Sequence, residues 1–258
     1  NSATYMHCGK VVVNFPPGKI TSGKLKRFMK VSIWSDVRCP FCYIGKKKFE
    51  DALEKFSNKH EVVIVWKSFQ LDPSLKTDTH TSMLDYFVKT KGVSEEQAMQ
   101  MFSGATKMAE ETGIAMNIQK GILANSFNAH RLIQFAKTRG LGNEVKEALF
   151  KIHFEEGKNI DDISILSEVA VSIGLDAEEV KQVLKSDDFA YEVKQDEMEA
   201  RNIGVRGVPF FVFDDKYAIS GAQPVEAFLQ TLEKVWEENK SELKISEGDS
   251  CSSEGNCD

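Results

Sequence analysis

The chain has 258 residues, of which 41% are hydrophobic and 28% are charged, and its formal net charge is -6. This length allows one large or two small domains, and the composition is that of an ordinary globular protein. The negative net charge gives no reason to expect a nucleic-acid partner, and no apolar run approaches the about 20 residues of a transmembrane helix, so no membrane partner is expected either.

Residues 1–28 differ from the rest of the chain. They contain no periodic segment and are rich in Gly, Pro and Lys. The chain opens with Asn, whereas Met29 leads directly into a predicted strand, so we interpret 1–28 as a disordered extension or a vector remnant. An additional strand over 10–15 is the alternative. The apolar run 11–13 is shorter than the about 7–15 residues of a signal-peptide core.

A strand, a short turn and a helix are predicted around a Cys-Pro-Phe-Cys sequence. Apolar residues alternate with polar ones over 31–33, as in a strand, and then recur at helical spacing over 49–56. Pro40 suits the first helical turn, because its missing N–H would have no partner there. This places Cys39 at the N-cap and Cys42 inside the first turn.

The placement of these two cysteines indicates redox chemistry. A thiolate is the attacking species in disulfide exchange, and the free N–H groups and the positive end of a helix favour an anion. We therefore predict a lowered pKa for Cys39, as the nucleophile, and assign Cys42 as the resolving cysteine. Two inert cysteines, or half of a zinc site, are the alternatives. No metal is expected, because zinc needs four close ligands and no His or second Cys-x-x-Cys has a suitable spacing.

A second strand and a long helical segment follow. The continuous apolar run 62–66 is typical of a strand covered on both faces, and it completes a βαβ unit. From about residue 82 to 202, apolar residues recur at helical spacing between N-cap residues and closing glycines, which predicts seven helices. We assign the apolar stripe that contains Met101 and Met108 to the core rather than to a ligand surface.

The chain then returns to strands and closes with a helix. Strands over 205–213 and 216–220 are predicted to pair as a hairpin that turns at 214–215. The final helix opens at Pro224. Pro209 lies at the mouth of a strand, where proline is unusual and marks a bulge or a cis peptide bond.

Residues 241–258 are rich in Ser, Glu and Gly and are predicted to be a flexible tail. Within this tail, Cys251 and Cys257 can close a small ring or reach another disulfide, so they are candidates for an auxiliary redox pair. Incidental thiols in a solvated tail, or metal binding, are the alternatives.

The order of these elements and three motifs resemble a known family. The elements follow the order of the thioredoxin fold with a helical insertion, as in the DsbA-like family. Segments 29–45, 128–132 and 204–211 are similar in particular to its FrnE-type branch. That branch belongs to the same superfamily as 2-hydroxychromene-2-carboxylate isomerases and kappa-class glutathione transferases. The similarity covers about residues 29–237.

The resemblance implies an α/β fold class, a thioredoxin fold with a large all-helical insertion. The thioredoxin-fold domain would be discontinuous, over 29–78 and 203–240, and the insertion would span 79–202. The insertion is expected to lie over the active site and to shape the substrate groove. FrnE-type proteins are typically bacterial and cytoplasmic, and we expect the same here. Some members carry a second cysteine pair near the C-terminus, to which Cys251 and Cys257 would correspond.

The resemblance also implies roles for single residues. Cys39 would attack and Cys42 would resolve, beside a cis peptide bond between Val208 and Pro209. The loop before this proline would offer backbone groups to an extended substrate chain. The predicted substrate-binding residues beside the cysteines are Pro40, Phe41, Val208 and Pro209.

Three further features have two interpretations each. His130 is either a structural histidine or a groove residue that tunes the Cys39 thiolate or binds substrate. Trp34 either is an aromatic residue at a strand end or packs near the disulfide. The lysines 46–48 are interpreted as a solvated helix face that could also raise the potential near the thiolate.

Retention of both cysteines favours a thiol–disulfide oxidoreductase, which would act as an oxidase, reductase or isomerase on protein or small-molecule disulfides. No bound cofactor is expected, and glutathione is a candidate redox partner. The isomerase and transferase relatives usually have Ser in place of Cys39, so a glutathione-dependent isomerase or transferase acting on a small aromatic substrate is the alternative. A non-catalytic binding module is a third hypothesis.

Overall fold

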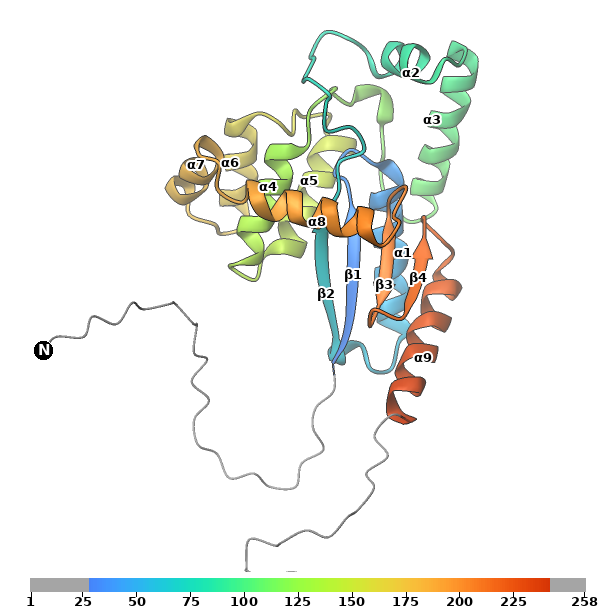
Figure 1. The fold of residues 1–258 in the computed structure, drawn as a ribbon. Helices are drawn as coiled ribbons and strands as arrows, with labels where there is room; N and C mark the ends of the chain where they lie inside the picture. Colours follow the sequence, from blue (N-terminus) through green and yellow to red (C-terminus); the bar gives the residue numbers. More distant parts are fainter. Residues whose placement is uncertain (1–27, 242–258) are drawn as a thin grey trace, which may run out of the picture.

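A four-stranded sheet forms the centre of the computed structural model, which describes residues 28–241 (Figure 1). Its strands are β1 (Met29–Ser35), β2 (Val62–Ser68), β3 (Phe210–Phe213) and β4 (Tyr217–Ser220), in the spatial order β2-β1-β3-β4. β1 and β2 run parallel, whereas β3 runs antiparallel to both β1 and β4. This arrangement confirms the predicted thioredoxin fold. The interpretations of residues 1–27 and of Cys251 and Cys257 lie outside the described residues.

Helices account for most of the remaining chain. The α-helices are α1 (Pro40–Lys55), α2 (Met83–Lys91), α3 (Glu95–Glu110), α4 (Phe127–Lys137), α5 (Gly142–Phe154), α6 (Ile163–Ser172), α7 (Ala177–Lys185), α8 (Ala190–Asn202) and α9 (Val225–Ser241). Two short 3-10 turns are η1 (Lys59–Glu61) and η2 (Ile118–Lys120). Between β2 and β3, where every residue is described, the seven α-helices match the number predicted for the insertion.

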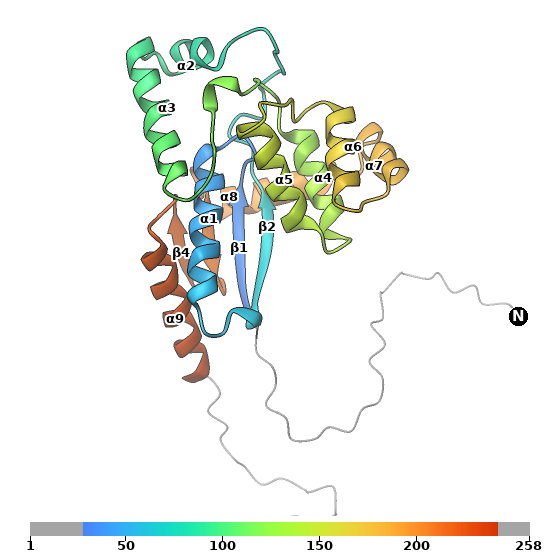
Figure 2. The same ribbon diagram turned by 180° about the vertical axis from the view of Figure 1, so that it is seen from behind.

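The helices cover both faces of the sheet, as Figures 1 and 2 show. α1 and α9 lie side by side on one face, and α8 crosses the other. The α2–α3 hairpin stands above the N-terminal end of α1, and α4 to α7 form a separate group beside β2. No helix among residues 28–241 is both long and apolar enough to cross a membrane.

The central strand and the first helix share the main core. Val31 of β1 pairs with Ile64 in β2 and with Phe213 in β3, so β1 is enclosed by strands on both sides. On the α1 face, the ring of Phe49 lies 5.6 Å from Phe211 and 5.8 Å from Phe228, measured between ring centroids. Aromatic side chains from three distant segments therefore hold α1 against the sheet.

Local signals set most of the helix boundaries. Ser94 and Gln97 form the predicted capping box at the start of α3. The Asp176 side chain accepts hydrogen bonds from the first turn of α7, and Gly92 ends α2 in the left-handed conformation. The strand predicted over 205–213 is shorter in the structure, because β3 begins only after Pro209, which has no N–H to donate to a ladder.

Candidate active site

The two cysteines lie at the start of α1, as predicted. Cys39 is the N-cap residue, with an extended backbone, and Pro40 occupies the first helical position. The backbone N–H of Cys42 donates to the Cys39 carbonyl oxygen at 3.0 Å. Both thiols are free, and both residues are buried, Cys39 with 4% and Cys42 with 1% of its surface exposed. The pair is thus a reduced dithiol in which Cys39 is the more accessible member.

A loop from the far end of the sequence closes over Cys39. The peptide bond between Val208 and Pro209 is cis, and the Cys39 thiol donates to the Val208 carbonyl oxygen at 3.4 Å. Gly45, one turn along α1, packs against this loop, because a Cβ there would lie 2.8 Å from Cγ of Pro209. The fold therefore brings together the dithiol and the cis-proline loop.

The surroundings of Cys39 differ from the expectation in one respect. The hydrogen bond with Cys42, burial and the nearby negative charge of Asp36 raise the pKa of the Cys39 thiol well above its ordinary value. The predicted lowering of this pKa is wrong for the reduced pair. The prediction rests on the free N–H groups and the positive end of the helix, whereas the Cys39 side chain makes no capping hydrogen bond and donates to a carbonyl oxygen.

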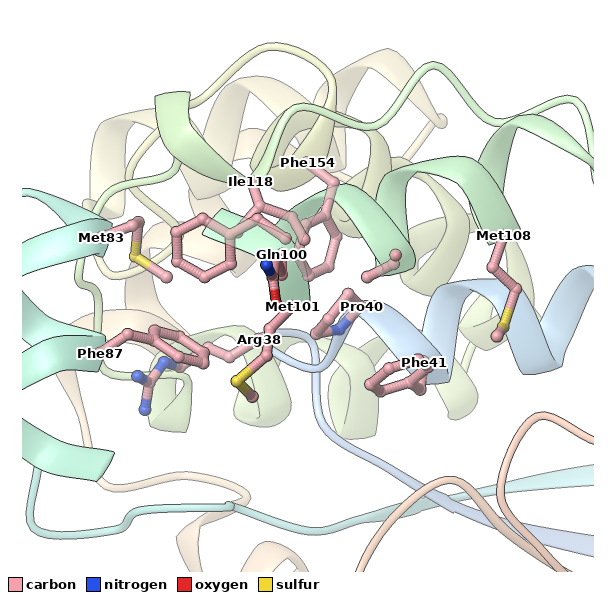
Figure 3. A pocket seen from close by; sticks show the side chains of 13 residues that line it. Arg38, Pro40, Phe41, Met83, Phe87, Gln100, Met101, Met108, Ile118 and Phe154 are labelled. Atoms are coloured by element: carbon pink, nitrogen blue, oxygen red, sulfur yellow. The ribbon is translucent and has the colours of Figure 1, made fainter. Parts of the chain in front are cut away.

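A hollow of about 360 Å³ opens between the start of α1 and the α2–α3 hairpin (Figure 3). Phe41, exposed at 42%, lines the hollow beside Pro40. The other labelled lining residues are Arg38, Met83, Phe87, Gln100, Met101, Met108, Ile118 and Phe154. The lining is therefore mostly apolar and rich in methionine, and it adjoins the dithiol.

This hollow corrects the assignment of the α3 stripe. Ala98, Phe102 and Ala105 are buried, as predicted for a core face. Met101, however, is 49% exposed and lines the hollow, and Met108 also lines it. Periodicity located the apolar face but could not distinguish core from cavity wall, because both require apolar residues at the same spacing.

Asp36 fills the turn between β1 and α1. Its carboxylate accepts hydrogen bonds from the N–H groups of Leu71 at 2.8 Å and Arg38 at 3.2 Å, and lies 3.3 Å from Nε2 of His130. Burial favours the neutral acid, but the hydrogen bond and charge of His130, the Leu71 N–H and the charge of Arg38 hold the pKa of Asp36 well below its usual range. This contact and the 1% exposure of His130 favour its structural interpretation.

Comparison with known proteins decides the family. The model of the DSBA-like thioredoxin domain matches residues 30–233. The chain belongs to the DsbA-like thioredoxin family.

Individual relatives agree with this assignment. The probable DsbA oxidoreductase of Streptomyces coelicolor is 39% identical, with a TM-score of 0.80, and the match covers 89% of this chain and 98% of that one. The uncharacterised protein YwbO of Bacillus subtilis is 28% identical over 206 residues, which cover 78% of this chain and 94% of YwbO. A 2-hydroxychromene-2-carboxylate isomerase is 15% identical, with a TM-score of 0.60, over 82% of this chain and 98% of that one. The last likeness shows a shared fold alone.

Two buried basic side chains of α5 in this DsbA-like domain were missed in the sequence. Lys146 of α5 is 1% exposed, and Nζ donates to the Ser35 carbonyl oxygen at 3.2 Å. His153, also in α5, is 2% exposed, and its Nδ1 has no hydrogen-bond partner. One signal was available, because Lys146 stands four residues before Phe150, and His153 three residues after it, on a face that is otherwise apolar.

The lysines after the dithiol are not a solvated face throughout. Lys46 is 2% exposed, and its Nζ forms ion pairs with Glu50 at 2.7 Å and Glu147 at 2.6 Å. The prediction is therefore wrong for Lys46, because α5 of the insertion covers it. Lys47 is partly exposed and pairs with Asp51 one turn later, as expected of a helix surface.

Trp34 lies on the other face of the sheet. Its Nε1 donates to the Asp196 carbonyl oxygen at 3.0 Å, and its ring packs with Ala200 and Val205. This position agrees with the interpretation as a strand-end aromatic residue that anchors α8.

Within residues 28–241 there is no group of three or more His, Cys, Asp or Glu residues arranged to hold a metal ion.

Proposed function

We propose that this protein is a thiol–disulfide oxidoreductase that works through the Cys39–Cys42 dithiol. The observation that carries the proposal is the position of the free Cys39 thiol, 3.4 Å from the carbonyl oxygen that precedes the cis Pro209. Membership of the DsbA-like family and the likeness to the probable DsbA oxidoreductase of Streptomyces coelicolor support it.

The exchange proceeds in two displacements. In the oxidised protein, a substrate thiolate attacks Sγ of Cys39, the bond between the two active-site sulfurs breaks, and its electron pair goes to Sγ of Cys42. A second substrate thiol loses its proton to solvent, and the resulting thiolate attacks the substrate sulfur of the mixed disulfide. Cys39 then leaves as a thiolate, the substrate is oxidised, and the protein dithiol is reduced. The reverse sequence reduces a substrate disulfide.

A polypeptide disulfide is the substrate class that the hollow favours. Its apolar wall includes Pro40 and Phe41 beside the dithiol and Phe87 and Met101 opposite. Such a wall suits a bulky apolar side chain next to a substrate cysteine, and methionines adapt to varied shapes. Val208, before the cis-proline, has its carbonyl at Cys39 and is suited to contact an extended substrate backbone.

The alternative is a glutathione-dependent isomerase or transferase acting on a small aromatic substrate. An apolar hollow would also accept an aromatic ring, so it does not separate the two functions. The presence of Cys39, where those relatives usually carry Ser, supports the dithiol mechanism. Glutathione is then a redox partner rather than a cofactor.

A redox titration of the Cys39–Cys42 pair tests the proposal. The protein, with Cys8, Cys251 and Cys257 changed to Ser, is equilibrated in glutathione buffers, and free thiols are counted by mass after alkylation. We expect one reversible two-electron transition, which is absent after Cys42→Ser. A stable glutathione adduct on Cys39 without such a transition, with turnover that survives Cys42→Ser and requires glutathione, would instead support the isomerase or transferase.

A further inference from the structure

Lys146 is a buried cation without a carboxylate partner. Its side chain is enclosed by Trp66 and Phe150, whose ring centroids lie 5.7 Å and 4.9 Å from Nζ. Its recorded hydrogen bond goes to the neutral carbonyl of Ser35. Within the described part of the chain, no Asp or Glu oxygen lies within ion-pairing distance of Nζ, unlike the case of Lys46.

Such an arrangement costs folding free energy, because an ammonium group leaves water without a compensating charge. Burial accordingly lowers the pKa of Lys146 to about 8, although the charges of Cys42, Asp36 and Cys39 act in the opposite direction. These three groups, at the end of β1 and the start of α1, and the like charge of Lys46 on α1 are the ionisable groups whose charges act on Lys146.

Of the anionic groups facing Lys146, Asp36 is already satisfied. Its carboxylate has the N–H groups of Leu71 and Arg38 and the ring of His130 as partners. The Cys39 thiol already has the Val208 carbonyl oxygen and the Cys42 N–H as partners. Cys42 is the cysteine that the fold encloses more completely. The charge left without a counter-ion is therefore the negative charge of a thiolate.

We propose that Lys146 is the counter-cation of the negative charge that develops on Sγ of Cys42 when the active-site disulfide opens. The inference rests on the proposed dithiol function. When a substrate thiolate attacks Cys39, the electron pair of the broken bond goes to Cys42, and the buried ammonium of Lys146 stabilises it through space. In the reverse direction, the same ammonium stabilises the Cys42 thiolate that attacks Sγ of Cys39 and releases the substrate thiolate.

This role has a direct consequence for the redox equilibrium. The ammonium stabilises only the reduced protein, since the disulfide carries no charge. Lys146 therefore makes the couple more oxidising, and its removal favours the disulfide. One pKa unit of lost thiolate stabilisation corresponds to about a tenfold change in the equilibrium constant with glutathione, or about 30 mV for this two-electron couple.

The test compares Lys146→Met with the parent protein, both with Cys8, Cys251 and Cys257 changed to Ser. The equilibrium constant with glutathione is measured at neutral pH, and thiolate formation by the pair is followed by ultraviolet absorbance across a pH series. We expect the pair to form its thiolate about one pH unit higher and the constant to shift towards the disulfide, by up to about tenfold at a pH where the parent pair carries the thiolate. Lys146→Gln, which keeps a donor for Ser35, gives the same shifts and serves if the Met variant does not fold.

Lys137→Met is the matched control. Lys137 is another largely enclosed lysine of the insertion, and its Nζ donates to the Trp66 carbonyl oxygen at 2.9 Å, but the charges that face it belong to Asp196, Lys67, Glu192 and Glu199 rather than to a thiol. We expect its redox constant to equal that of the parent.

The outcomes separate the two proposals. A parent without a two-electron transition overturns the dithiol function. A parent with a transition that neither Lys146→Met nor Lys146→Gln shifts overturns the role of Lys146 alone. An equal shift in Lys137→Met also overturns that role, because the loss of any positive charge in the insertion would then change the redox constant.

Discussion

At the scale of single residues, His153 links the active-site region to acid stability. It lies in α5 with its Nδ1 unpartnered, and burial, with the positive charge of Arg38, lowers the pKa of His153 to about 4. The folded protein therefore holds this imidazole neutral at a pH where an unfolded chain protonates it. His153 therefore does not lower the free energy of unfolding above about pH 6.5, and it lowers this free energy progressively as the pH falls towards 4.

His153→Leu should remove this pH dependence. We expect the parent to lose about 3 kcal/mol of unfolding free energy between pH 6.5 and pH 4 through this residue, and the variant to lose correspondingly less. Denaturant unfolding at both pH values measures the difference. His60→Leu is the control, since His60 is exposed. Parallel pH dependence of the parent and His153→Leu would show that another group is responsible.

At the scale of elements, the contact between α1 and the cis-proline loop depends on a glycine, Gly45, which has no side chain. A Cβ at Gly45 would lie 2.8 Å from Cγ of Pro209 and 3.5 Å from Ala222. A proline ring cannot swing aside as a flexible side chain can, so the loop or the helix would have to shift. The register of the dithiol against the Val208 carbonyl is therefore set partly by this glycine.

Gly45→Ala should destabilise the protein although alanine is the better helix former. We expect a loss of about 1–3 kcal/mol of unfolding free energy from overpacking. Gly104→Ala in α3 is the matched control, because nothing lies within 4 Å of a Cβ there, and it should gain up to about 1 kcal/mol. Denaturant unfolding measures both. If Gly45→Ala were as stable as Gly104→Ala, the loop around Pro209 would be able to move away from the added Cβ without a loss of unfolding free energy.

At the scale of the whole molecule, the insertion and the thioredoxin-fold domain together form the hollow. α1 contributes Pro40 and Phe41 from one side, whereas the α2–α3 hairpin contributes Phe87 and Met101 from the other (Figure 3). Neither part alone forms this wall, so substrate choice should depend on how the hairpin is placed over the dithiol.

Met101→Glu should weaken the selection of apolar substrates. Two synthetic peptide disulfides are compared, with Phe or with Ser beside each cysteine. We expect the Phe peptide to lose about tenfold in kcat/KM, mostly through KM, because a carboxylate would face its ring, a change of about 1.4 kcal/mol. The Ser peptide should be affected little. Met198→Glu on α8, a methionine of similar exposure, is the control. Equal losses for both peptides would argue against binding in the hollow.

Local patterns in the sequence determined the order of the elements, the position of the dithiol at a helix start and the helix boundaries. These features depend on short-range effects, since Ser94 caps its own helix and Pro40 occupies the turn that suits it. The motifs also identified the family. The bounds of β3 were less accurate, because a strand requires a partner and the pattern around Pro209 does not show where pairing begins.

The tertiary structure alone decided which charges are buried and what faces the dithiol. Lys46 and Lys146 carry the same side chain, but the carboxylates around Lys46 come partly from another helix, and the thiols that face Lys146 come from a segment about a hundred residues earlier. The pKa of Cys39 depends on the same enclosure. Burial and long-range charge arise only when distant segments pack together, so no pattern within one segment could have predicted them.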